Sequence, residues 1–254
     1  MAKAAQMDIR KYALRLGDNA LILSQQISAW CGHAPALEED IAFANVALDL
    51  IGQATNWLNY AAELSEEPTT ADHLAFLRDE REFSNVLLVE YPNTDFAHSL
   101  MRQFLFDCWH YPLLRALCNS TDKGVAEIAQ KSIKEVAYHL ERSSDLIIRL
   151  GDGTEQSHEY MQSALNALWR FTGELCTSDA LDMSMYEHGV GPDLSAVHTE
   201  FQSHIDKVLK LAMLNLPEKV QMRSGGKSGI HSEAMGPLLA EMQYLQRTHP
   251  GASW

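Results

Sequence analysis

The sequence has no long apolar run, and its few cysteines follow no paired motif. No stretch of about 18 uncharged apolar residues occurs, so a transmembrane helix is not expected. The first residues contain no apolar stretch leading to a small-residue cleavage site, so we expect no secretory signal and predict a cytoplasmic protein. Cys31, Cys108, Cys118 and Cys176 show no Cys-x-x-Cys spacing and are predicted to be reduced, buried thiols.

Basic residues are scarce relative to acidic ones. The chain has 20 Lys and Arg residues against 34 Asp and Glu residues, a formal net charge of −14. This charge argues against nucleic acid or an anionic membrane as the main partner. Motifs of several enzyme classes are also missing: there is no G-x-S-x-G nucleophile turn, no G-x-G-x-x-G dinucleotide fingerprint and no H-E-x-x-H metal motif.

Helical periodicity runs through most of the chain, and no alternation typical of strands appears. Predicted helices cover about residues 9–30, 37–64, 95–119, 124–150, 155–176, 193–214 and 238–247. Asp95 and Thr154 are expected to cap two of these helices. The sequence therefore predicts an all-α protein.

Four long helices joined by short loops are typical of an antiparallel four-helix bundle. We predict one domain over residues 1–254, with a core bundle at about 9–151 and further helices at about 154–254 packed on it. No repeat with a fixed period is present.

The predicted helix at 37–64 has two apolar faces. One face carries Ile41, Ala44, Leu48, Ile51 and Leu58, and the other carries Phe43, Val46, Leu50, Ala54 and Trp57. Two such faces suit a helix that packs both on the core and on a partner. The alternative is that both faces are covered within the chain itself.

Two polar segments allow competing interpretations. Residues 78–82, RDERE, are either an ion-pair patch or, as we favour, a solvated helix face. The glycine-rich segment 223–237 is either a surface loop or a contact for a partner. Glycine lets backbones approach closely, and two side chains there offer donors; the candidate residues are Gly225, Gly226, Lys227 and His231.

Polar groups at one-turn spacing almost form a di-metal carboxylate site. Such sites take one carboxylate from each of two helices and a Glu-x-x-His pair from each of two others. In the helix at 37–64 the Glu and His positions hold Leu50 and Gln53, and in the helix at 124–150 the Glu position holds Val136 beside His139. Leucine and valine cannot bind a metal, and a carboxamide is a poor substitute for imidazole. The helical spacing of such a site is present, but the ligand residues are not.

Other carboxylates fit the site poorly. Asp49 and Glu135 each lie one position, about 100°, away from the required helical phase. Asp107 and His139 are in phase, and we expect them to share a hydrogen bond with Gln53 as a third partner. Asp107 with His110 offers too few ligands alone. The one Glu-x-x-His pair, Glu155 and His158, lies in a polar first turn typical of a solvated helix end.

An ordered set of motifs carries a family resemblance. The motifs are LRLGDNALILSQ, WCGHAP, LDLIGQA, RDEREFSNVLLVEYPNTDFA, RQFLFDCWH, IKEVAYHLERS, LWRFTGEL and GGKSGIHSEAMGPLLAEMQYLQRTHPG. Over nearly its whole length the chain resembles the ferritin-like, non-catalytic C subunits of phenylacetyl-CoA epoxidase complexes, the PaaC type. The catalytic A subunits have metal-binding residues at the positions equivalent to Leu50, Gln53 and Val136, and a carboxylate equivalent to Asp107.

The resemblance implies a structural role. It implies no catalytic residue and no metal in this chain, with di-iron held by a catalytic A subunit as partner and NADPH electrons delivered through a reductase subunit. Acyl-CoA is then expected near the interface between the subunits. The alternatives are a self-sufficient di-metal oxygenase with atypical ligands and a metal-free helical binding protein.

Overall fold

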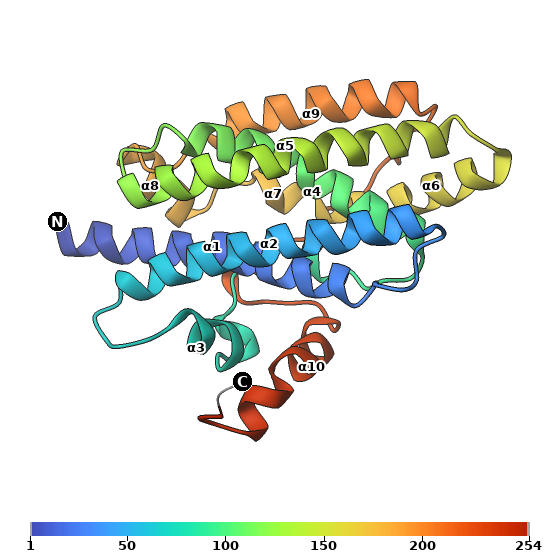
Figure 1. Ribbon diagram of the computed structural model, residues 1–254. Helices are drawn as coiled ribbons and strands as arrows, with labels where there is room; N and C mark the ends of the chain where they lie inside the picture. The colour runs from blue at the N-terminus through green and yellow to red at the C-terminus, as the bar shows by residue number, and fades with distance from the viewer. Residues whose placement is uncertain (1, 253–254) are drawn as a thin grey trace. The chain divides into compact units, whose positions relative to one another are not determined.

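The computed structural model describes the chain over residues 2–252, which form helices, turns and loops without a strand in that range. The predicted all-α, ferritin-like class is confirmed by long helices that pack in pairs, α1 with α2 and α4 with α5 (Figure 1). The chain groups into two compact units, Met1–Pro92 with Gly225–Trp254, and Asn93–Ser224. That they form one domain stays a prediction.

The first unit is built on two long helices joined by the short connection at 29–36. Its elements are α1 (Ala2–Ser28), α2 (Leu37–Glu63), α3 (Ala71–Phe76), η1 (Glu80–Glu82), η2 (Leu87–Glu90), η4 (Gly226–Ser228) and α10 (Met235–Thr248). Thr70 begins α3 by accepting a hydrogen bond from the backbone N of His73. In Figure 1, α10 lies near α3, which it contacts although about 160 residues separate them in the sequence.

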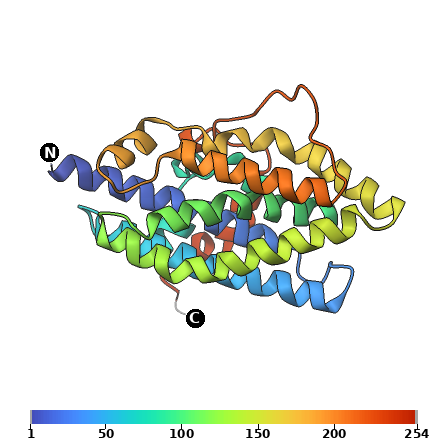
Figure 2. The ribbon, with the colours of Figure 1, turned by 90° about the horizontal axis from the view of Figure 1, so that it is seen from above.

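The second unit is built on α4 and α5, with α6 and α9 packed against them (Figure 2). Its elements are α4 (Phe96–Leu117), α5 (Lys123–Gly151), α6 (Glu155–Leu168), η3 (Trp169–Phe171), α7 (Gly173–Cys176), α8 (Ala180–Glu187) and α9 (Leu194–Leu211). The predicted caps are confirmed, since Asp95 accepts from the backbone N of His98 and Thr154 from that of Ser157. Gly151 ends α5 where a side chain would lie 2.4 Å from the Ala212 carbonyl oxygen.

Two boundaries in the second unit differ from the prediction. The predicted helix at 155–176 is interrupted by η3, where the Thr172 hydroxyl donates to the Trp169 carbonyl and competes with the regular helical bonds. The short α8 was not predicted. Asp179 starts it by accepting from the backbone N of Asp182, whose carboxylate accepts from Asp179 in return.

The two apolar faces of α2 have different surroundings. The face with Phe43, Val46, Leu50, Ala54 and Trp57 is buried. On the other face Leu58 is buried, but Ile41, Leu48 and Ile51 are 52%, 66% and 42% exposed. The interpretation in which the chain covers both faces is therefore wrong for these three residues.

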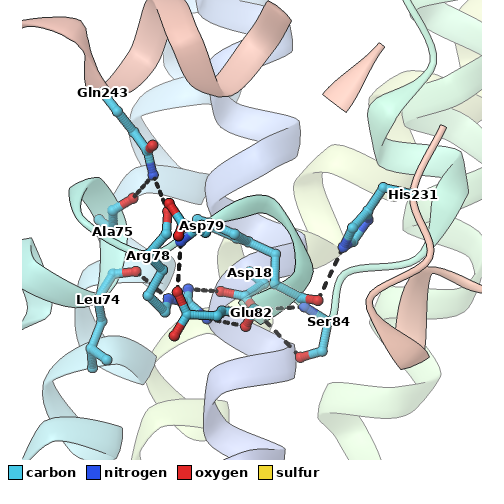
Figure 3. A network of polar contacts seen from close by, with 10 residues as sticks. Asp18, Leu74, Ala75, Arg78, Asp79, Glu82, Ser84, His231 and Gln243 are labelled. Carbon is cyan, nitrogen blue, oxygen red and sulfur yellow. Dashed lines mark hydrogen bonds and ion pairs between the residues drawn. The ribbon is translucent and has the colours of Figure 1, made fainter. Parts of the chain in front are cut away.

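The charged segment 78–82 is not uniformly a solvated face. Arg78 is buried, and its guanidinium forms a two-pronged ion pair with the fully buried carboxylate of Asp18 (Figure 3). It also donates to the backbone oxygens of Leu74 and Glu82. The solvated interpretation was wrong for Arg78 because a buried carboxylate, 60 residues earlier in the chain, needs a cation.

Hydropathy agrees with the sequence-based expectation on membranes. Within residues 2–252, no helix combines the length and the apolar character that crossing a bilayer requires.

Candidate functional site

The positions predicted to correspond to metal ligands are all buried. Leu50 and Gln53 lie on α2 of the first unit, and Asp107, Val136 and His139 lie on α4 and α5 of the second unit. The predicted burial of Leu50 and Val136 is confirmed, with both fully inaccessible to solvent. Neither side chain has an atom that could bind a metal, so these residues do not fit a di-iron pair.

The carboxyl group of Asp107 is held by neutral groups of the second unit. Gln103 Nε2 donates to Oδ1 at 2.6 Å, and the Ser143 hydroxyl donates to Oδ2 at 2.9 Å. The predicted hydrogen bond from His139 to Asp107 is wrong. Gln103 lies one turn before Asp107 on α4 and Ser143 one turn after His139 on α5, so the same spacing argument could have found both.

Burial keeps this cluster uncharged near neutral pH. It raises the pKa of Asp107 from 3.8 to about 8, against the opposing effect of the Ser143 and Gln103 hydrogen bonds. Burial, together with the nearby His139, lowers the pKa of His110 to about 3. The His110 ring lies against Phe106, with 4.8 Å between the ring centroids. Burial also raises the pKa of the Cys108 thiol, so that thiol is not a ready nucleophile.

The remaining ligand candidates are not brought together. Asp49 and Glu135 are half-buried, and each interacts with groups elsewhere in the chain. His158 contacts the Gly151 carbonyl oxygen through Nδ1 at 2.7 Å, across the α5–α6 turn, while Glu155 is exposed. Among the residues the structure describes, no group of three or more His, Cys, Asp or Glu side chains could hold a metal.

The glycine-rich loop is fastened to its own unit. A side chain at Gly226 would lie 2.2 Å from the Asn85 carbonyl oxygen, and one at Gly229, where φ is +74°, would lie 2.5 Å from that of Arg81. Only glycine fits such close backbone approaches. Gly225 has φ +142° and faces Ile230 of the same loop. Lys227 also has an interaction within the chain; a partner contact through this loop stays a prediction.

His231 has a different place from the one expected. Its side chain is fully buried, with Nδ1 2.6 Å from Glu90 Oε1 and Nε2 3.0 Å from the Phe83 carbonyl oxygen. Asn85 Nδ2 donates to the same Glu90 oxygen, and the Ser232 backbone N donates to the other. His231 therefore offers no donor to a partner but holds the loop to the segment 83–90.

The His231 ring faces two acceptors and is expected to carry two protons. Burial alone lowers the pKa of His231, but the hydrogen bond to Glu90, its negative charge, the Phe83 carbonyl and the charge of Glu80 outweigh burial and raise it. The pair is then a buried imidazolium and carboxylate, which hold the segment that leads to α10.

Comparison with known proteins places the chain in a family. Its sequence matches, over residues 1–254, the family described as phenylacetic acid catabolic protein. The chain belongs to this family. A curated relative from Escherichia coli (strain K12), named as the C subunit of 1,2-phenylacetyl-CoA epoxidase, is 50% identical over 243 residues, which cover 96% of this chain and 98% of the relative.

This membership confirms the resemblance stated from the motifs. The match spans both compact units and includes α2, α4 and α5, so the helices with the incomplete ligand set belong to the shared fold. The predicted ligand positions of this member of the phenylacetic acid catabolic protein family therefore lie within the region it shares with the relative.

Replacing Asp107 with asparagine is expected to change how stability depends on pH. Because the folded pKa of about 8 lies above the ordinary 3.8, the stability from the protonated form is complete below about pH 4 and is lost as pH rises to 8. Asp107→Asn should cost about 1 kcal/mol below pH 4 through a poorer hydrogen-bond match, and this difference should narrow and reverse as pH rises toward 8. Urea unfolding at several pH values measures it. Exposed Asp145→Asn is the control, and an unchanged pH profile in Asp107→Asn would contradict the assignment.

Removing the imidazole of His231 is expected to loosen the loop and α10. Because the pKa of His231 is raised in the folded protein, the stability that the charged imidazole contributes is complete below about pH 6.5. This contribution is lost as pH rises through the pKa that His231 has in the folded state. His231→Ala should therefore cost roughly 1–3 kcal/mol at pH 6 and less at high pH. Hydrogen exchange of the α10 amides and urea unfolding measure this. Exposed His73→Ala should behave as the parent, and equal protection of α10 in both variants would refute the role.

Proposed function

We propose that the chain is the non-catalytic structural subunit of a 1,2-phenylacetyl-CoA epoxidase and pairs with the catalytic A subunit of that complex in aerobic phenylacetate degradation. The observation that carries the proposal is the 50% identity, over 96% of the chain, to a protein named as the C subunit of this enzyme. Similarity at this level over the full length of both chains is what a shared role predicts.

The chemistry of the buried frame supports the non-catalytic part of the proposal. Leu50 and Val136 supply no ligand atom, Gln53 supplies only an amide, and Asp107 is engaged by Gln103 and Ser143. We propose that this chain holds no metal of its own, that the di-iron resides in the A subunit, and that NADPH electrons enter through a reductase subunit. No catalytic step is assigned to this chain.

A permanent partner requires a large surface, about 2,000–5,000 Å² in typical obligate complexes. The exposed apolar residues of α2 supply a starting point for such a surface. A structural subunit in this role stabilises the A subunit and helps to shape the site that receives acyl-CoA. We further propose that the complex works in the cytoplasm, where coenzyme A thioesters are metabolised.

Coexpression with the A subunit, followed by mass and metal analysis of each chain, tests the proposal. We expect the two chains to copurify, with iron in the A subunit only. A chain that stays a lone monomer in the presence of the A subunit would refute the complex. About two irons in this chain, lost in His139→Ala, would support the self-sufficient oxygenase instead.

Activity of the assembled complex gives a second test. A His139→Ala chain that still folds and assembles should support epoxidation at the parental rate. Loss of catalysis in a fully assembled complex, with normal iron in the A subunit, would contradict the non-catalytic assignment.

A further inference from the structure

One exposed face of α2 contains no charged residue over five turns of helix. Its members are all exposed, and we name them the α2 face: Ile41, Asn45, Leu48, Ile51, Gly52, Thr55 and Asn59. The single acid in this span, Asp49, is half-buried and lies outside the α2 face. A side chain added at Gly52 would meet nothing within 4 Å, so this position lets another backbone come close.

The exposed face of α5 shows what a solvated helix of the same protein looks like. Besides Tyr138 and Gln130, its exposed residues are charged: Lys123, Glu127, Lys131, Lys134, Glu141, Asp145 and Arg149. Ion pairs within the helix join Lys123 with Glu127 and Asp145 with Arg149. The α2 face has neither the charges nor the pairs. Depletion of charge combined with large apolar side chains is the composition of an interface core.

The chain segment that contains the α2 face carries charges of one sign. Residues 16–77 contain no Lys or Arg but nine Asp and Glu residues: Asp18, Glu38, Glu39, Asp40, Asp49, Glu63, Glu66, Glu67 and Asp72. Of these, Glu38, Glu39 and Asp40 lie in the first turn of α2, and Glu63 ends the helix. The uncharged face therefore has an acidic first end, whereas its other end carries both signs, because Arg10 and Lys11 of α1 line a cavity together with Glu66 and Glu67.

This arrangement decides which partner fits. A second copy of the chain on the same face would bring the acidic first turns of α2 together in the parallel pairing. In the antiparallel pairing, each acidic first turn would face an end that carries both acidic and basic groups, so neither pairing gives full charge complementarity. Like charges across an interface disfavour association, while opposite charges speed it.

We propose that the α2 face is the docking surface for a different subunit, one that presents an apolar helix face with Lys or Arg opposite the acidic first turn of α2. This inference rests on the proposed function, because it assigns the surface through which the A subunit is bound. The apolar residues provide the affinity, and the acidic first turn orients the partner and disfavours a second copy in the parallel pairing.

Leu48→Asp tests the apolar centre, with the purified A subunit as the probe. We expect binding at least 100-fold weaker than that of the parent, measured by calorimetry. The matched control is Tyr138→Asp on α5, a similarly exposed apolar residue at 54%, which should bind within threefold of the parent. Leu48 is exposed, so both variants should keep the parental circular dichroism and melting temperature; Ile41→Asp serves as an independent repeat.

A double charge reversal tests the acidic end. Glu38→Lys with Glu39→Lys should slow association with the A subunit roughly tenfold at low salt, and the difference should largely vanish at about 1 M salt. Glu127→Lys with Glu141→Lys, on the exposed face of α5, is the matched control. Equal rates for both double variants at low salt would overturn the charge complementarity.

The outcomes separate this inference from the proposed function. If the parent binds the A subunit and Leu48→Asp binds equally well, the α2 face is not the docking surface and the proposed function stands. If the parent itself does not bind, both fall. If the parent alone sediments as a dimer and Leu48→Asp as a monomer, the occupant is a second copy and the inference is overturned.

Discussion

Replacing Arg78 with methionine lowers the free energy of unfolding by about 3–5 kcal/mol, the usual cost of breaking a buried ion pair from one side. Asp18 is fully buried, and Arg78 is its cationic partner. Asp18 also accepts from the backbone N and hydroxyl of Ser84, but these neutral donors do not neutralise the carboxylate. Methionine keeps most of the apolar stem volume, so the loss is chiefly electrostatic. Urea unfolding followed by circular dichroism measures it.

Other contacts of Arg78 add to the effect. Its guanidinium lies 4.1 Å from the centre of the Phe83 ring, and Nη1 donates to the Glu82 carbonyl oxygen at 2.9 Å. Figure 3 shows that Gln243 of α10 donates to the carbonyl oxygens of Ala75 and Arg78 in the same network. Loss of the cation is therefore expected to weaken the attachment of α10 as well.

Two variants control the Arg78 experiment. Arg81→Met removes an exposed cation three residues away and should change stability by less than about 0.5 kcal/mol. Adding Asp18→Asn to Arg78→Met removes the orphaned charge and should restore part of the loss. If Arg78→Met unfolded with the parental free energy, or if the double variant regained no stability, the ion pair would not be a major contributor to the stability of the fold.

Replacing Leu50 with glutamate is expected to cost several kcal/mol at neutral pH. The side chain has no solvent access, and a carboxylate placed there loses its hydration without gaining a cation. Burial raises the pKa of such a group, by up to about 3–5 units when it is complete. The variant should therefore regain stability as pH falls toward about 4, where the new carboxyl is protonated in both the folded and unfolded states.

The neighbouring face of the same helix supplies the control for Leu50. Leu48→Glu makes the same chemical change two residues away, at a side chain that is largely exposed, and should leave the unfolding free energy nearly unchanged. If the Leu50→Glu variant had the same unfolding free energy as the Leu48→Glu variant in metal-free buffer at pH 7, position 50 would not be enclosed by apolar groups.

Helical class and the burial of the predicted ligand positions were predictable from the sequence. Local signals decide both: apolar spacing places Leu50, Val136 and His139 in buried positions, and side-chain chemistry alone shows that leucine and valine cannot bind iron. Caps such as Asp95 and Thr154 were predicted for the same reason, since the donor and the acceptor lie within one turn.

Hydrogen-bond partners were predicted less well. Periodicity correctly placed Asp107 in the interior but assigned it His139 instead of Gln103 and Ser143. Several polar side chains on two helices share one phase, and rotamers decide which of them meet. The spacing of residues along a helix shows which polar side chains share one face. It does not show which of them form hydrogen bonds with each other.

The sequence by itself determined the long helices, the apolar stripe of α2 and the residue types at the predicted ligand positions, because each depends on residues a few positions apart. Tertiary structure alone decided that Arg78 pairs with Asp18 and that His231 pairs with Glu90. It also decided that Leu48 stays exposed while Leu50 is enclosed. These outcomes depend on which distant segments pack together. A buried charge takes whichever opposite charge the fold brings to it, and an apolar face is covered only where another element reaches it.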